Sequence, residues 1–457
     1  MQRMNALDAG MFFAENHTSP LQIGTVTVFE GPAPAYPDLV RQVFARLRLA
    51  PRCLQRVRTV PFNLAHPVWV DDQRFSIDDH ILHTTAPEPG GPEELHELAG
   101  RLLAPPLDLT RSPWQVWLVE GLADGRWALI CKVHHCMVDG LAGIDLLAVL
   151  LDTDPDWTPA KPRVWMPEPE PSATAVLRDG VMDGLKGFGR QAGRLFLPAL
   201  RDAFGVASAV PGYVTRLSGS GASSLNGPTG QCRRWMRTYA GLDEVDRIRR
   251  TFGGSVNDVV LAATARGFRD LLEARGLLSG ESIVRAMVPV SVRSADERGV
   301  PSNRVSAVPV DLPCGEADPL RRLHLVREQM DGLKSRDQAA GLDAFVKLFG
   351  GAPGLLAAAA HTALRLRQPL IHTIVTNVPG PTFPLYAMGR RMLEIDPYIP
   401  IAAGLRVSVG IVSYDGALSF GLTADHDAVP DLETLCAGIR EGIDELLKEA
   451  AQTAAAT

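Results

Sequence analysis

Apolar residues follow two different periods along this chain, and segments of the two kinds alternate. A run rich in β-branched residues at 22–30 and an almost wholly apolar run at 127–133 predict strands, while a helical pattern at 39–49 and a mostly buried one at 141–150 predict helices. The second half continues this mixture, with helices predicted at 242–252 and 256–274 and strands at 283–292, 305–312, 374–378, 407–412 and 417–423. The pattern therefore predicts an α/β protein in both halves.

A stretch rich in proline and charge, from 152 to about 171, suggests where the first half ends. An amphipathic helical pattern over 173–205 and a Gly/Ser-rich stretch at 218–224 follow it. Because 457 residues exceed what one hydrophobic core normally organises, two domains are expected. We predict an N-terminal domain at 1–160, a Pro-rich and helical connection at 161–230 and a C-terminal domain at 231–457, whose Ala-rich tail from 449 is expected to fray.

Charge and cysteine content exclude several classes of protein. The net charge is -6 and no dense Lys/Arg run occurs, which argues against a nucleic-acid partner. Six cysteines without a Cys-x-x-Cys pair suit a reducing cytosol and argue against structural zinc. Asp8 and Glu15 interrupt the region where an export signal would be apolar, and no run reaches the roughly 20 apolar residues that cross a bilayer. We expect a cytoplasmic protein whose membrane contact is at most peripheral.

The segment Lys132-Val-His-His-Cys-Met-Val-Asp-Gly140 joins a predicted strand to a predicted helix and carries the candidate chemistry. An imidazole, with an unperturbed pKa of about 6.5, suits the removal of a proton from a hydroxyl group that attacks a thioester. The alternative is a pair of interior histidines at a strand end. Zinc is not favoured, because adjacent strand residues point to opposite faces and no second His/Cys cluster accompanies them.

Asp139 and Gly140 have structural interpretations. Asp139 precedes a helical run, so it can cap that helix or pair with an arginine such as Arg293. Gly140 allows a close backbone approach and shapes the turn. A serine nucleophile elbow and a phosphate-binding P-loop are both missing from the sequence, so serine-hydrolase and P-loop chemistry lack their basic parts.

Several further motifs occur in a recognisable order: Leu7-Asp-Ala9, Pro20-Leu-Gln-Ile-Gly24, Leu225-Asn-Gly-Pro228, Val256-Asn-Asp-Val-Val-Leu261, Val288-Pro-Val-Ser-Val-Arg293 and Thr376-Asn-Val-Pro-Gly-Pro381. Together with His134 to Gly140, they make the chain resemble the bacterial wax ester synthase/diacylglycerol acyltransferase family over nearly its whole length. The resemblance implies a chloramphenicol acetyltransferase-like fold of two mixed-sheet domains flanked by helices, with the active site in a tunnel between them. It also implies His135 as general base, acyl-CoA as donor, diacylglycerol or a fatty alcohol as acceptor, and no cofactor or metal.

The same resemblance points to residues of the second domain. Asn257 and Asp258 lie in the family's Asn-Asp segment, and Thr376 and Asn377 in its Asn-Val-Pro-Gly-Pro segment. Asn257, Thr376 or nearby backbone amides could donate hydrogen bonds to the oxyanion that forms on the thioester carbonyl. Alternatively, Asn257 caps the helix that begins near Asp258, and 379–381 is only a turn.

Two features leave alternatives open. The chain has Ser112-Pro113-Trp114 where family members usually carry Pro-Leu-Trp, so Trp114 either affects acyl-chain selectivity or packs in the core. The amphipathic segment at 181–204, with Phe188, Phe196 and several basic residues, suits either a membrane or lipid-droplet interface or a connecting helix packed on the domains.

Two other functions compete with the acyltransferase interpretation. A condensation-type domain of peptide assembly shares the His-His-x-x-x-Asp-Gly signature but takes its acyl groups from carrier proteins, and no carrier domain is fused here. A non-catalytic lipid-binding protein would keep the fold without turnover. The intact His134, His135, Asp139 and Gly140 argue against this second alternative.

Overall fold

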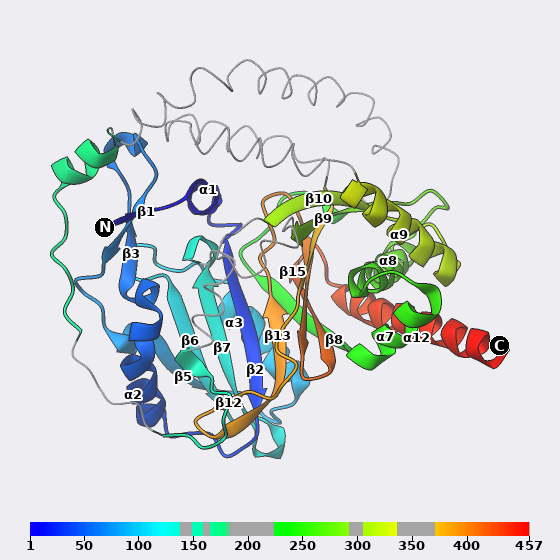
Figure 1. Cartoon of the computed structure of the whole chain (residues 1–457), viewed down its shortest axis with the longest axis horizontal. Coiled ribbons are helices and arrows are strands. Elements are labelled where there is room, and N and C mark those ends of the chain that lie inside the picture. The colour runs from blue at the N-terminus through cyan, green and yellow to red at the C-terminus, as the bar shows by residue number, and fades with distance from the viewer. Residues whose placement is uncertain are drawn as a thin grey trace.

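The computed structural model describes residues 1–137, 149–158, 165–180, 182, 224–291, 305–335 and 371–456. These residues form two six-stranded mixed sheets and one small three-stranded sheet, with helices on their faces (Figure 1). The mixed α/β class predicted from the sequence is confirmed. None of the helices in the described ranges is both long and apolar enough to cross a membrane.

The N-terminal sheet has the strand order β12-β13-β2-β7-β6-β5. Its strands are β2 Gln22–Phe29, β5 Ile81–Thr85, β6 Trp114–Glu120, β7 Trp127–His134, β12 Tyr386–Ala387 and β13 Arg390–Tyr398. Every residue of β7 is buried because both faces of the sheet are covered, which explains its unbroken apolar run. Helix α2 (Tyr36–Arg46) joins the core on one face, with Leu129 of β7, and α3 (Pro92–Leu103) joins the core on the other, with Ile130.

Strands β12 and β13 come from the C-terminal part of the chain. β13 pairs antiparallel with β2, from Met392 opposite Phe29 to Tyr398 opposite Gly24 (Figure 1). The segment predicted as the C-terminal domain therefore contributes two strands to the sheet of the N-terminal segment, which the sequence analysis did not foresee. The boundaries at 160 and 230 stay predictions.

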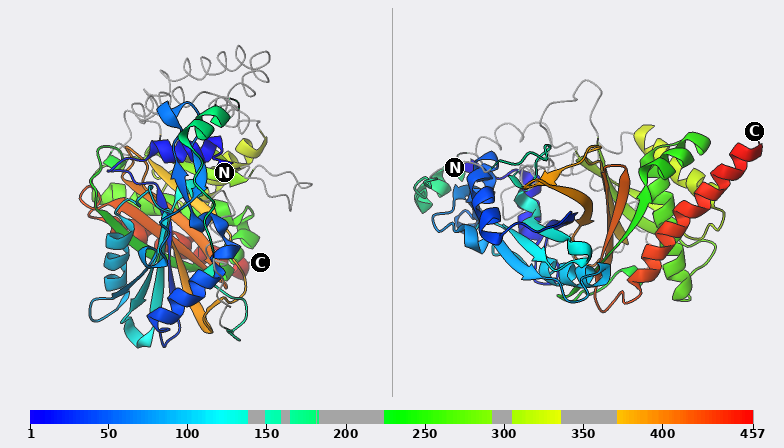
Figure 2. Two further views of the ribbon diagram at one scale, coloured as in Figure 1. Left: turned by 90° about the vertical axis from the view of Figure 1, so that its left-hand side faces the viewer. Right: turned by 90° about the horizontal axis from the view of Figure 1, so that it is seen from below.

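The C-terminal sheet has the order β10-β9-β11-β14-β15-β8. Its strands are β8 Arg233–Gly241, β9 Val284–Ser291, β10 Val305–Leu312, β11 Thr373–Val378, β14 Val407–Tyr414 and β15 Ala417–Asp425. The associated helices are α7 Leu242–Phe252, α8 Val256–Ala274, α9 Pro319–Ser335 and α12 Leu432–Ala456. Helices α7, α8 and α12 lie on the face of this sheet that is turned away from the N-terminal sheet (Figure 2, right).

The two large sheets approach each other closely where β13 lies beside β14 and β15. A Cβ atom on Gly421 would be 1.8 Å from the carbonyl oxygen of Pro397, and one on Gly410 would be 3.2 Å from the Cβ of the same proline. Trp235 Nε1 also donates a hydrogen bond to the Pro397 oxygen, at 3.1 Å. Backbone contact without intervening side chains therefore joins the two halves at this point.

A third, smaller sheet lies at the N-terminal side of the molecule. It has the order β1-β4-β3, with β1 Gln2–Arg3, β3 Gln55–Arg58 and β4 Val68–Asp71, and β1 leads into α1 Ala6–Ala14. Residues 173–180 are helical and pack on this sheet through Val176, which is fully buried with Val60, Val68 and Val70.

The local predictions largely agree with these elements. The predicted helices at 242–252 and 256–274 coincide with α7 and α8, and each strand predicted in the C-terminal half has its counterpart. One prediction is wrong: α12 continues to Ala456, and Ala450 is 2% exposed, so the tail does not fray from 449. Most of the predicted helix at 141–150 and nearly all of the amphipathic segment at 181–204 lie outside the described residues.

Candidate active site

His134 is the last residue of β7 and both of its ring nitrogens are engaged. The residue is completely buried. Its Nδ1 accepts a hydrogen bond from the backbone N–H of Cys136 at 3.1 Å, and its Nε2 lies 3.2 Å from Glu15 Oε2. Because Nδ1 must be an acceptor, Nε2 carries the proton and donates a hydrogen bond to the carboxylate of Glu15. His134 therefore has no ring nitrogen available to a substrate.

His135 begins the short 3-10 helix η6 (His135–Met137) and is available in a way that His134 is not. Its backbone N–H donates to the Leu21 oxygen at 2.8 Å, which fixes the position of the residue. The residue is partly exposed, and no side chain of the described ranges hydrogen bonds to its ring. Burial lowers the pKa of His135 below its usual value, and the neighbouring His134 lowers it further, while its own backbone carbonyl acts in the opposite direction. The ring is therefore neutral at pH 7 and can accept a proton.

Glu15 holds this turn from the other side. It follows α1, whose N-terminus is capped by Asn5. Glu15 Oε1 accepts the backbone N–H of Leu21 at 3.2 Å, while Oε2 faces His134. The carboxylate of Glu15 therefore bonds both to the ring of His134 and to Leu21, whose carbonyl oxygen accepts the backbone N–H of His135.

The structure brings together two residues predicted from the second domain. Asn377 on β11 donates a hydrogen bond from Nδ2 to Oδ1 of Asn257, at the start of α8, at 3.5 Å. Thr376 lies next to Asn377 and opposite Gly410 in the pairing of β11 with β14. In the described ranges, no hydrogen bond joins His135 to these residues.

Asn257 does not cap α8, so that alternative is wrong. The cap is Ser255, and Asp258 completes a capping box by accepting the Ser255 N–H at 2.7 Å and its hydroxyl at 2.8 Å. Asp258 is 1% exposed and has a structural role at the helix N-terminus. The side chain of Asn257 is thus not needed for the cap.

Trp114 packs in the core of the N-terminal half. It is fully buried on β6, its Nε1 donates to the Cys53 oxygen at 2.8 Å, and its ring stacks on His80 with centroids 4.6 Å apart. The structure therefore agrees with the alternative in which Trp114 packs in the core. An effect of Trp114 on acyl-chain selectivity stays a prediction. Asp139, Gly140 and Arg293 lie outside the described residues, so their predicted roles stay predictions too.

Sequence reasoning assigned no structural role to Gln22, Lys132 or Glu15, three polar residues near the turn. Gln22 Nε2 donates to the oxygens of Leu103, Ala104 and Pro105 at 2.6–3.1 Å. Lys132 is also buried, and its Nζ donates to the Leu102 oxygen at 3.1 Å; burial lowers its pKa to about 8, although Glu15 opposes the shift. The motif Pro20–Gly24 pointed to Gln22, whereas Glu15 had no distinguishing pattern around it.

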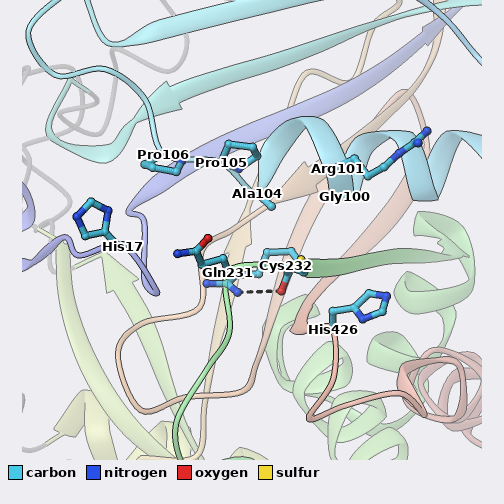
Figure 3. A pocket seen from close by; sticks show the side chains of 10 residues that line it. His17, Gly100, Arg101, Ala104, Pro105, Pro106, Gln231, Cys232 and His426 are labelled. Atoms are coloured by element: carbon cyan, nitrogen blue, oxygen red, sulfur yellow. Dashed lines mark hydrogen bonds between the residues drawn. The ribbon is translucent and has the colours of Figure 1, made fainter.

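A surface recess of about 470 Å³ is lined in part by the loop that follows α1 (Figure 3). His17, two residues after Glu15, lines it together with Ala104, Pro105 and Pro106 from the end of α3. Gln231 and Cys232, at the start of β8, and His426, at the end of β15, line the opposite side. The recess is thus built from both halves of the chain next to the loop that holds the histidines.

The family model described as the wax ester synthase/diacylglycerol acyltransferase catalytic domain matches residues 4–260, and the model of that family's C-terminal domain matches 302–447. The chain belongs to the wax ester synthase/diacylglycerol acyltransferase family. It is an acyl-CoA-dependent O-acyltransferase of this class. The resemblance noted from the sequence is therefore confirmed.

Relatives and solved structures agree with this family. The chain is 36% identical, over 98% of its own length and 96% of theirs, to a putative diacylglycerol O-acyltransferase of Mycobacterium bovis and a probable one of Mycobacterium tuberculosis. A solved wax ester synthase/diacylglycerol acyltransferase from Marinobacter aquaeolei superposes with a TM-score of 0.71 at 23% identity, covering 98% of this chain and 100% of that one. That likeness confirms the predicted fold. A tunnel between the halves stays a prediction.

Proposed function

We propose that this chain transfers a long-chain acyl group from acyl-CoA directly to the hydroxyl of diacylglycerol, making triacylglycerol, and that it also accepts fatty alcohols. Diacylglycerol is the first choice because the curated relatives at 36% identity are named for it. A fatty alcohol is also an apolar molecule with a hydroxyl group, so one apolar site could accept either. The donor and the acceptor are the only small molecules that the reaction requires, and no cofactor takes part.

His135 is the proposed general base, and the different environments of the two histidines carry this proposal. The neutral ring of His135 takes the proton from the acceptor hydroxyl as its oxygen attacks the thioester carbonyl. The new C–O bond forms, the C–S bond breaks, and the imidazolium returns the proton to the sulfur of the departing CoA. Both substrates are bound together, so no acyl-enzyme intermediate is needed.

Asn257 is the proposed donor to the oxyanion. Because its Oδ1 accepts the hydrogen bond from Asn377, the amide group of Asn257 is oriented with its Nδ2 as a donor. A preorganised donor aimed at the carbonyl oxygen stabilises the negative charge that develops there. Thr376 and nearby backbone amides are further candidates.

Because the proposed acceptors are insoluble in water, the protein must reach them at a lipid surface. We propose that it acts in the cytoplasm and associates peripherally with the inner membrane face or with lipid bodies, where diacylglycerol is concentrated. The condensation-type alternative shares the fold alone, since a solved condensation domain of the CDA synthetase superposes with a TM-score of 0.57 at only 16% identity. No observation favours the carrier-dependent reaction.

The test is turnover by the purified protein with palmitoyl-CoA, offering diacylglycerol and hexadecanol in parallel and following both the released thiol and the lipid products. His135→Ala is expected to lose activity, while His83→Ala, a change at an exposed histidine on β5, serves as the control. Wild-type turnover by His135→Ala would contradict the mechanism. If neither ester forms while acyl-CoA still binds, the non-catalytic lipid-binding alternative replaces this proposal.

A further inference from the structure

We propose that the loop at 59–67, with Phe62 at its tip, docks this enzyme on an anionic phospholipid surface. The inference deepens the proposed function and rests on it, because it places the enzyme where an insoluble acceptor is found. The loop joins β3 to β4 and includes the short 3-10 turn η3 (Pro61–Asn63). It stands at the N-terminal side of the molecule with the helix at 173–180 (Figure 1, upper left).

Phe62 is an apolar residue exposed to water, and its backbone lies in a region that phenylalanine rarely adopts. Its exposed fraction is 81%, the joint highest among the large apolar residues recorded as exposed, and Leu64, two residues later, is 39% exposed. Phe62 and Asn63 have φ angles of 59° and 51°, in the left-handed region. Asparagine tolerates this region, but a bulky aromatic residue rarely adopts it. A strained backbone that displays an apolar ring gains nothing for folding, which points to a role outside the fold.

The base of the loop is well packed, so Phe62 is held outward. Val60 is buried with Val68, Val70 and Val176, which belongs to the helix at 173–180. This helix approaches the loop so closely that a Cβ on Gly180 would lie 3.0 Å from the Cβ of Ala65. Met182, just beyond Gly180, is 49% exposed and adds apolar surface at the end of this helix.

The charges around the tip complement an anionic surface. Residues 59–67, Thr-Val-Pro-Phe-Asn-Leu-Ala-His-Pro, include no carboxylate. Arg56 and Arg58, which precede the loop, share the single carboxylate of Glu170 at 2.5 and 2.9 Å, so this group of three keeps a net positive charge. Arg3 donates to the carbonyl oxygen of His66 at 2.8 Å and holds the other end of the loop.

An apolar tip with a basic collar is the arrangement that binds the headgroup region of anionic membranes. A protein partner would require a broader complementary area, whereas a narrow tip needs only to insert. The loop also contacts a segment that leads to the active site, because Arg3 on β1 bonds the backbone of His66 and β1 leads through α1 to Glu15. Docking by this loop would therefore anchor the element that ends at the catalytic turn.

Vesicle flotation tests the proposal without any need for turnover. The wild-type protein is expected to float with vesicles of phosphatidylcholine and phosphatidylglycerol at 7:3, weakly with phosphatidylcholine alone, and less as salt increases. Phe62→Ser is expected to weaken partitioning by about tenfold, the loss expected for one buried phenylalanine. Leu277→Ser, a change at an exposed leucine (39%) of the C-terminal half, is the control and should leave binding intact.

Phe62→Trp adds a direct readout, since its fluorescence should shift to the blue when anionic vesicles are added. Wild-type flotation by Phe62→Ser, or an unshifted Phe62→Trp spectrum, would overturn the proposal. So would a change in self-association of Phe62→Ser by analytical ultracentrifugation with unchanged flotation, because the tip would then contact a second copy of the chain.

In activity assays, Phe62→Ser should lose more turnover on diacylglycerol in vesicles than on dissolved hexanol. If the wild-type enzyme is inactive on both diacylglycerol and hexanol, the proposed function is refuted. Flotation would still decide whether the loop at 59–67 docks on the vesicles.

Discussion

Glu15 Oε2 lies 3.2 Å from His134 Nε2, so a carboxylate on the loop after α1 sets the tautomer of the buried histidine at the end of β7. The N–H of Cys136 occupies the other ring nitrogen. His134 is thus a positioning residue: its two hydrogen bonds fix the turn in which His135, the next residue, is placed.

Glu15→Ala is expected to lower kcat by about 100-fold, because a base displaced by about 1 Å can lose that much rate. KM for acyl-CoA should change little. Glu15→Gln keeps one oxygen that can accept from His134 but turns an NH2 group toward the Leu21 N–H, so it should recover part of the activity. Steady-state kinetics of the three proteins checks this prediction, and equal loss in the Ala and Gln variants would show that the hydrogen bond to His134 does not by itself position His135.

The pH dependence of kcat/KM should report the pKa of His135. A general base must be unprotonated, so activity falls as pH decreases through this pKa. Burial and His134 lower the pKa, which places the acid limb of the profile below about 6.5, the ordinary histidine value. Activity should be constant across neutral pH. A limb centred above 7 would contradict the assignment of His135 as the base in this environment.

Gly421→Ala should destabilise the contact between the two large sheets. The added Cβ would meet the Pro397 oxygen at 1.8 Å, so a backbone segment has to move, at an expected loss of about 1–3 kcal/mol in the free energy of unfolding. Gly332→Ala is the control, because no described residue lies within 4 Å of a Cβ at this position of α9, and an alanine in a helix should maintain or raise the stability. Denaturant unfolding measures both. A free energy of unfolding for Gly421→Ala equal to that of the wild type would mean that β13 does not contact β15 as closely as described.

The free energy of unfolding should decrease as pH falls from about 6.5 to about 4, and His372 should account for part of the decrease. Burial, reinforced by Arg285, lowers the pKa of His372 to about 4 in the fold, while an unfolded histidine titrates at about 6.5. Between these values the unfolded chain binds a proton that the fold does not, which lowers stability by about 1.4 kcal/mol per pH unit.

His372→Asn tests this contribution. Nδ1 of His372 accepts the backbone N–H of Arg285 at 2.9 Å, and an asparagine oxygen can replace that acceptor without titrating. Urea unfolding between pH 4.5 and 7.5 should show a shallower slope for this variant than for the wild type. The exposed His83→Asn serves as the control, and an unchanged slope in His372→Asn would refute the assignment.

The sequence by itself determined the family and most of the local elements, and it located the motif proposed to carry the chemistry. Helices α7 and α8 were predicted with their observed bounds, because an amphipathic period and the caps at Gly241 and Ser255 are properties of neighbouring residues. The position of the two histidines after a buried strand was readable for the same reason.

Only the tertiary structure decided which segments meet. β13 pairs with β2 across more than 360 residues of chain, from Tyr398 to Gly24, and its own sequence does not specify that partner. Glu15 likewise acquires its role only because α1 packs beside the turn after β7. Strand partners and side-chain contacts of this kind depend on the free energy of the whole core, whereas helix periods and caps depend on a few adjacent residues.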